Sequence, residues 1–274
     1  MRYGLSLPTG GACGDPRFLV ELSTLAERSG WEGVFLEDYL WYQGDPAIPT
    51  CDSWVALTAI AMRTTELVLG IEVVALPRRR PWKVAREATG IDQLSGGRLI
   101  LGFGSGDRRD PGFSHVGEEV DPRIRGERLD EGLQIVAGLW TGEPFSHRGR
   151  HYAVDEVTFR PTPLQRPRIP IWVGGGYPNE RAIERSLRWD GSCFYRREGG
   201  HLTADDVREL RGRAGDRPWT ISVGGQPRRD DWDEEREQIG AIAAAGADWW
   251  LEWIEPADRQ AMTAAVERGP LRVA

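Results

Sequence analysis

Residues 94–109, LSGGRLILGFGSGDRR, hold an apolar run of five residues between two glycine-rich segments. Their spacing excludes two nucleotide-binding fingerprints. The dinucleotide fingerprint G-x-G-x-x-G is absent, because the glycines at 102, 104 and 106 recur as G-x-G-x-G. The Walker loop needs Lys followed by Ser or Thr, and Asp107 stands where that Lys would be. The stretch therefore predicts a strand over 99–103 that ends in a flexible glycine loop.

The same succession of a strand-like run and an amphipathic run recurs along the chain. Eight such units in 274 residues predict an α/β fold, a closed (β/α)8 TIM barrel, with a doubly wound sheet as the alternative. The expected strands are 3–7, 33–36, 67–74, 99–103, 171–173, 191–194, 220–223 and 249–253. The expected helices are 17–29, 53–63, 82–94, 123–139, 180–187, 204–214, 233–245 and 257–268. Residues 141–170 break the period as a hairpin excursion with a proline-rich return, between the fourth and fifth units. We expect one barrel domain over 1–274.

Composition excludes several classes of function. The net charge of −7 disfavours a nucleic-acid partner, and no apolar run is long enough to span a membrane. The N-terminus, MRYGLSLP, enters a strand-like alternation directly, so we expect a cytoplasmic protein. Three widely spaced cysteines argue against a disulfide framework or a cysteine zinc site. Lys83 is the single lysine, so a bound anion must be held by arginine or by backbone amides.

Barrel enzymes carry their chemistry in the loops at the carboxyl ends of the strands, and two of these loops stand out here. After the second strand, Asp38, Tyr39, Trp41 and Tyr42 form an acidic and aromatic cluster. Such a cluster suits a flat polar ring, or it is an aromatic loop packed over the barrel mouth. After the third strand, three consecutive arginines at 78–80 predict either a solvated face or a contact with a phosphate or a partner.

The loops after the fourth and fifth strands are rich in glycine. Residues 104–107, GSGD, would let the backbone approach a ligand closely. Residues 174–176, GGG, run into Asn179 at an expected helix start, where free backbone amides make an anion site. The alternative for the second loop is a tight turn that only glycine permits. Among the features read from physical chemistry alone, this loop is the best phosphate candidate.

The histidines and the serine pattern give weaker evidence for a metal site or a catalytic nucleophile. His147 and His151 have i,i+4 spacing, but Gly149 lies between them in a non-helical segment. A surface hairpin is therefore favoured over a metal pair, and we expect no metal. His115 is the histidine nearest the expected barrel mouth. The G-x-S-x-G nucleophile elbow is absent, because Gly104 directly precedes Ser105.

Together these motifs resemble the bacterial luciferase-like monooxygenase family of flavin-dependent barrels, over nearly the whole chain. The most specific segment is LSGGRLILGFGSGD, with RRRPWKVAREATGIDQ before it and RPRIPIWVGGGYPNERA after it. The resemblance implies FMN or the deazaflavin coenzyme F420 as cofactor, and a homodimer. It also implies a ring-contacting loop after strand two, a bulge in strand three behind the ring, a wall after strand four and a phosphate loop after strand five. The corresponding cofactor-binding residues are Asp38, Trp41, Glu72, Val73, Gly104, Ser105, Gly106, Asp107, Gly174, Gly175, Gly176 and Asn179.

Four functions stay open on this basis. The leading one is a flavin-dependent oxidoreductase, a monooxygenase that acts on a small organic substrate with reduced flavin from a separate reductase. Tyr39 or His115 would then donate a proton or hydrogen-bond the substrate. The second is a coenzyme F420-dependent hydride-transferring oxidoreductase, and the third is a non-catalytic, cofactor-poor barrel that serves as an accessory subunit. The fourth is a hydrolase that uses Asp38 with Glu252 or Glu255.

Overall fold

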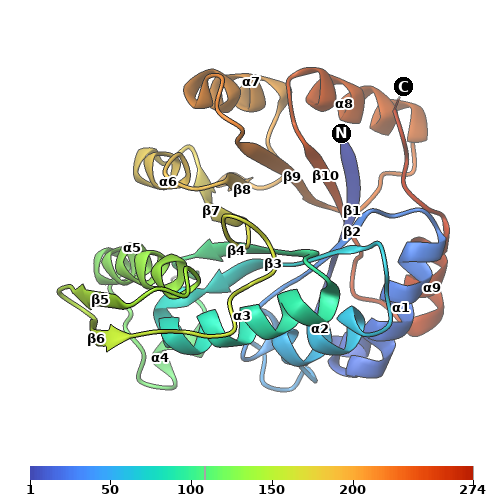
Figure 1. Ribbon diagram of the computed structural model, residues 1–274. Helices are drawn as coiled ribbons and strands as arrows, with labels where there is room; N and C mark the ends of the chain where they lie inside the picture. Colours follow the sequence, from blue (N-terminus) through green and yellow to red (C-terminus); the bar gives the residue numbers. More distant parts are fainter. Residues whose placement is uncertain (108, 274) are drawn as a thin grey trace.

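The strands of the computed structural model, which describes residues 1–107 and 109–273, close into a barrel (Figure 1). Among the described residues, eight parallel strands pair in the order β1-β10-β9-β8-β7-β4-β3-β2. They are β1 Arg2–Leu7, β2 Gly33–Leu36, β3 Val68–Ala75, β4 Leu99–Gly104, β7 Ile171–Tyr177, β8 Gly191–Arg196, β9 Thr220–Gln226 and β10 Trp249–Trp253. Because β1 pairs with both β2 and β10, the sheet has no edge. The predicted (β/α)8 TIM barrel is confirmed, and the doubly wound alternative is wrong.

Helices follow the strands and pack around the barrel (Figure 1). They are α1 Pro16–Arg28, α2 Ser53–Ala61, α3 Pro81–Ser95, α4 Pro111–Ser114, α5 Pro122–Leu139, α6 Glu180–Ser186, α7 Ala204–Ala214, α8 Trp232–Ala244 and α9 Arg259–Glu267. Local sequence sets several of their ends. Thr203 and Asp206 form a capping box at the start of α7, and Gly96 ends α3 in the left-handed conformation that glycine adopts without strain. Within the described part of the chain, no helix is both long and apolar enough to cross a bilayer.

Five strands, β3, β4, β7, β8 and β9, extend further toward their carboxyl ends than the sequence predicts, and the last three do so by more than one residue. The largest difference is in β7, where 174–176 belong to the strand and pair with 193–195 of β8. The interpretation of these glycines as a loop is therefore wrong. A run of three glycines carries no apolar alternation, so periodicity cannot reveal a strand whose pairing is set by its neighbour. Asn179 caps α6 as expected, since its side chain accepts a hydrogen bond from the backbone N–H of Ala182.

An aromatic cluster closes the barrel interior. Phe35 from β2, Trp172 from β7 and Trp249 from β10 contact one another with ring centroids 5.5–6.2 Å apart. These three strands are not neighbours in the sheet, so their side chains can meet only across the interior. All three rings are buried. They form a floor that separates the carboxyl-end mouth of the barrel from its opposite end.

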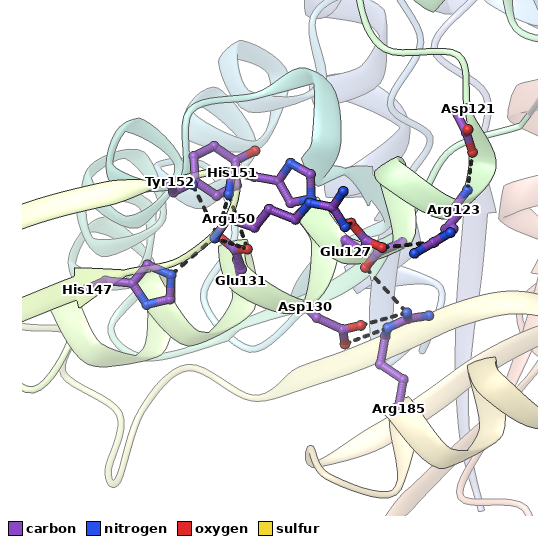
Figure 2. A network of polar contacts seen from close by, with 11 residues as sticks. Asp121, Arg123, Glu127, Asp130, Glu131, His147, Arg150, His151, Tyr152 and Arg185 are labelled. Carbon is purple, nitrogen blue, oxygen red and sulfur yellow. Dashed lines mark hydrogen bonds and ion pairs between the residues drawn. The ribbon is translucent and has the colours of Figure 1, made fainter.

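The excursion between the fourth and fifth units is a hairpin fastened to α5. Its antiparallel strands are β5 Phe145–Arg148 and β6 Ala153–Val157. Figure 2 shows the Glu131 carboxylate of α5 accepting hydrogen bonds from the backbone N–H groups of Arg150, His151 and Tyr152 in the hairpin turn. The His151 ring lies 2.8 Å from the Glu127 carboxylate. The hairpin interpretation is confirmed, and its contacts hold α5 beside the barrel mouth.

Candidate active site

A cavity of about 1380 Å³ opens at the carboxyl end of the barrel. Its walls are the carboxyl ends of β2, β3, β4, β7 and β8, together with parts of α5 and α6. A smaller cavity of about 320 Å³ adjoins it and shares Glu37, Glu72, Val73, Gly175 and Tyr195 with it. Ligand sites in proteins commonly measure about 300–1,000 Å³. The pair of cavities is therefore large enough for a cofactor and a small substrate.

Most of the predicted site residues come together in the larger cavity. Those that line it are Asp38, Tyr39, Glu72, Val73, Gly104, Ser105, Gly106, Asp107, Gly174, Gly175, Gly176 and Asn179. Trp41 and His115 are not among the lining residues. Trp41 precedes a 3-10 turn, Tyr42–Gly44, and its ring centroid lies 6.2 Å from that of the exposed His115. These two side chains contact each other outside the cavity, and their functional roles stay predictions.

Val73 lies at a bulge of β3, where the pairing of β3 with β4 shifts register between Ile71 and Val74. A Cβ added at Gly174 would lie 2.5 Å from Cγ1 of Val73, and one added at Gly104 would lie 2.9 Å from its Cγ2. Both positions therefore need glycine, because any larger side chain would overlap the valine. The glycines let the Val73 side chain pack directly against the backbone of β4 and β7, and all three residues line the same wall of the cavity.

The edge of β7 that faces β4 is open above this wall. β4 pairs with β7 only as far as Phe103 and Val173, whereas β7 continues to Tyr177 beside β8. In the described chain, the backbone of 174–176 therefore has a strand partner on one side alone. Its other edge can offer backbone N–H groups to a ligand, and all three glycines line the larger cavity.

Asp38 is held by arginines. Its carboxylate accepts hydrogen bonds from Arg79, at 2.5 Å and 3.1 Å, and from the backbone N–H of Ala75 at 3.3 Å. Arg78 donates to the Asp38 carbonyl and forms an ion pair at 2.8 Å with Asp110. Only 3% of the Arg78 side chain is exposed, and 20% of Arg79. The two interpretations of 78–80 as a solvated face or a phosphate contact are therefore wrong for Arg78 and Arg79, which brace the loop after β2.

Arginines also line the side of the larger cavity formed by α5 and α6. Three of them form ion pairs with a carboxylate: Arg109 with Asp107, Arg123 with Glu127 and Arg185 with Asp130. A fourth, Arg125, donates hydrogen bonds to the carbonyls of Gly106 and Asp107. Arg181 and Arg197 differ, since neither has a carboxylate within ion-pair distance in the part of the chain that the structure describes. Arg197 also lies against Gly176, 2.8 Å from the position of an added Cβ. This side of the cavity is suited to an anionic group.

Two carboxyl groups at the bottom of the mouth have strongly raised pKa values. Burial raises the pKa of Glu72 to about 8 and that of Glu37 to about 7. Each has one oxygen in a hydrogen bond, with Ser222 and Tyr42 respectively. Their other oxygens, Oε1 of Glu72 and Oε2 of Glu37, are buried without a partner among the described residues. Perturbed, unpartnered carboxyls in a cavity are typical of functional sites.

Sequence reasoning selected Glu72 but missed Glu37. The signal was available, because Glu37 is the first residue after a barrel strand, at the end where barrel enzymes place their chemistry. Tyr39, two residues further on, has its pKa raised to about 12 by burial and by nearby carboxylates. Its phenol therefore stays protonated at neutral pH and is available as a hydrogen-bond donor.

The hydrolase hypothesis does not fit this geometry. Glu252 is almost fully buried and pairs with the equally buried Arg228 at 2.7 Å. Neither it nor the exposed Glu255 lines either cavity. Asp38 is bound to Arg79. The carboxylates of that hypothesis are thus apart from one another or already neutralised by arginine.

The closed barrel, its mouth cavity and the bulge of β3 define the chain as a TIM barrel with a large cavity at the carboxyl end of its strands. The family described as luciferase-like monooxygenase matches residues 1–238, and the chain belongs to this family. The resemblance that the sequence motifs indicated is confirmed.

Relatives within this family carry different names. An F420-dependent glucose-6-phosphate dehydrogenase of Microbacterium testaceum is 30% identical over 60% of this chain and 48% of its own length. The oxygenase component of a flavin-dependent trigonelline monooxygenase of Acinetobacter baylyi is 28% identical over 71% of this chain and 51% of its own. The chain thus spans about half the length of these curated relatives. The structure of an F420-dependent secondary alcohol dehydrogenase shares the fold, with a TM-score of 0.78 and 14% identity over 98% of both chains.

Proposed function

We propose that the protein is a flavin-dependent oxidoreductase, and that it acts as a monooxygenase on a small organic substrate with reduced FMN. The observation that carries the proposal is the wall made by Val73 between Gly104 and Gly174 in the larger cavity. A Cβ at either glycine would displace the Val73 side chain, so the two glycines preserve the wall against which the flat ring of the cofactor would lie. The relative named as an oxygenase component supports the expectation that a separate reductase supplies the reduced flavin.

The residues around this wall have distinct roles in the proposal. Arg181, Arg197 and the open backbone edge of β7 would hold the phosphate, since they offer positive charge and N–H donors on the same side. Tyr39 would donate a hydrogen bond to the ring or substrate, because its phenol stays protonated. Bound reduced flavin would supply the electrons that activate O2. The aromatic floor would keep bulk water from entering through the opposite end of the barrel.

A second candidate is a coenzyme F420-dependent hydride transfer on the same scaffold. The observation that favours it is the similarity to relatives named as F420-dependent, at 30% identity for the one from Microbacterium testaceum. The larger cavity, at about 1380 Å³, also has room for a cofactor with an extended anionic tail. In this case the same arginines would hold the cofactor, and no oxygen chemistry would follow.

A spectroscopic titration tests both candidates. The purified protein is titrated with FMN, with riboflavin and with coenzyme F420, and the shift of the visible absorption bands is followed. We expect saturable binding of FMN, with riboflavin weaker because it lacks the phosphate. Saturable binding of coenzyme F420 alone would replace the first candidate by the second. A lack of any shift with all three would overturn both and favour the accessory barrel.

A further inference from the structure

The smaller cavity has a charge pattern of its own. Two carboxyl groups, Glu37 and Glu72, line it, and no Lys, Arg or His is present among its described lining residues. They lie side by side, because each follows one member of the register pair Leu36–Ile71 on the neighbouring strands β2 and β3. Adjacent strands lie about 4.8 Å apart, so the two carboxyls face the same small volume. Each presents one buried oxygen that has no partner among the described residues.

Aromatic side chains complete the walls of this cavity. Trp253 from β10, with Phe194 and Tyr195 from β8, stands around the carboxyl pair. The indole N–H of Trp253 is also buried without a partner in the described chain. Carboxylates together with ring faces are the two features that bind organic cations, through charge and through the quadrupole of the rings. A cluster of three or more groups able to hold a metal ion is not found among the described residues.

We propose that the smaller cavity binds a small organic cation, a protonated amine or an N-alkylated heteroaromatic ring, between the Glu37 and Glu72 carboxylates and the Trp253 ring. The cation is the substrate class of the proposed oxidoreductase, and this assignment of role rests on the proposed function. The binding itself does not, because every group that makes it belongs to the chain. The cavity of about 320 Å³ limits the cation to the size of a small ring or a short branched amine.

Proton linkage makes cation binding at this site depend on pH. With pKa values of about 7 for Glu37 and about 8 for Glu72, both carboxyls are largely protonated below neutrality. A permanent cation binds the ionised forms, so its binding must release protons and strengthen as the pH rises. Other titratable groups that face the pair are the phenols of Tyr39, Tyr42 and Tyr195 and the thiol of Cys193.

These neighbouring phenols and the thiol do not account for a change in cation affinity near neutral pH. Burial raises the pKa of Tyr39 to about 12, and it raises those of Tyr42 and Cys193 as well. Arg78, whose charge opposes the rise in the pKa of Tyr39, is already paired with Asp110. A change in cation affinity between weakly acidic and weakly basic pH is therefore assigned to the two carboxyls.

The test uses N-methylpyridinium, a permanent cation, and toluene, its neutral isostere, on the cofactor-free protein. Calorimetry or ligand-observed NMR measures each dissociation constant at several pH values. We expect N-methylpyridinium to bind at least about tenfold more tightly at pH 9 than at pH 6. Toluene should bind more weakly than the cation at pH 9 and show no such dependence. Equal affinities for the two probes, or a cation affinity that is flat or falls with pH, would overturn the proposal.

Two variants locate the effect. Glu37→Gln and Glu72→Gln keep the size of the side chain and remove its charge, so each should weaken N-methylpyridinium binding about tenfold at pH 9. Glu255→Gln is the matched control, because this exposed carboxylate follows the end of β10 but lines neither cavity. A loss of affinity in the control equal to that in the site variants would assign the binding to the general negative charge of the protein and overturn the site. Far-UV circular dichroism checks that each variant is folded. The pH series on the wild-type protein tests the proposal even if a variant does not fold.

The FMN titration is a separate experiment, so failure of the proposed function and failure of the cation site can be told apart.

Discussion

The replacement of Glu72 by Gln should stabilise the protein at neutral and basic pH. The Glu72 side chain is largely buried, and its Oε1 has no partner among the described residues, none of which brings a cation to the lining of the smaller cavity. Ionising this carboxyl in the folded state is therefore costly. Gln has nearly the same shape, and its amide can keep the hydrogen bond with Ser222. The substitution removes the titration while leaving the packing in place.

The size of the effect follows from the raised pKa. Burial raises the Glu72 pKa from an ordinary 4.5 to about 8, and each unit corresponds to about 1.4 kcal/mol. Below pH 4.5 the carboxyl is protonated in both states, and its neutral form contributes fully to stability. As the pH rises from there to about 8, the unfolded state ionises and the folded state does not, so stability is progressively lost. The variant Glu72→Gln should thus gain in unfolding free energy relative to the wild type as the pH rises. We expect this difference to be about 3–4 kcal/mol larger at pH 8 than at pH 5.

Urea unfolding of both proteins at a series of pH values measures this difference directly. The comparison between wild type and variant cancels the titration of all other groups, provided that the two proteins fold alike. Glu255→Gln, at an exposed position, serves as the control and should change the free energy of unfolding by less than about 0.5 kcal/mol. A stability difference for Glu72→Gln that stays constant from pH 5 to pH 8, or that favours the wild type as the pH rises, would refute the argument.

Three further substitutions test other parts of the site. Asp38→Ala should cost roughly 3–5 kcal/mol of unfolding free energy in thermal or urea melts, because it leaves the guanidinium of Arg79 buried without its partner; Asp155→Ala, at an exposed ion pair, should change little. Tyr39→Ala should weaken flavin binding about tenfold without altering the far-UV circular dichroism, and unchanged affinity would exclude a contact with the ring. Gly176→Asp should abolish FMN binding but affect riboflavin binding much less. Gly176→Asn, which has the same size as the Asp variant but no charge, should still bind FMN. Equal losses of FMN and riboflavin affinity would mean that this strand end does not hold the phosphate.

The barrel could be predicted from sequence because its signals are local. Apolar alternation, helical periodicity and glycine at helix ends all act within a few residues, as at Gly96 and at the Thr203 capping box. The carboxyl end of β7 could not be predicted, because 174–176 are held as a strand only by their pairing with β8. Family resemblance, by contrast, identified twelve cofactor-binding residues, and the fold brings eleven of them into one cavity, although they come from strands far apart in the chain.

Partners distant in the sequence explain the errors within the site. Arg79 and Asp38 are separated by 41 positions, and a run of arginines has the same local pattern whether it is solvated or buried in ion pairs. Glu37 differs from an ordinary surface glutamate only in what β1, β3 and β10 place around it. Neither burial nor a raised pKa is encoded in the adjacent residues, so only the assembled barrel reveals them.

The two cavities offer opposite charges to a ligand. The larger cavity offers Arg181 of α6 and Arg197, which follows β8, whereas the smaller cavity offers Glu37 and Glu72 and no cation among its described lining residues. A phosphate is attracted to the first region and repelled from the second once the carboxyls ionise. A cofactor with an anionic tail should therefore enter with its ring toward Val73 and its tail toward the arginines. An organic cation is repelled from the arginines and attracted to the carboxyls, so the same polarity that orients the cofactor would select the substrate beside it.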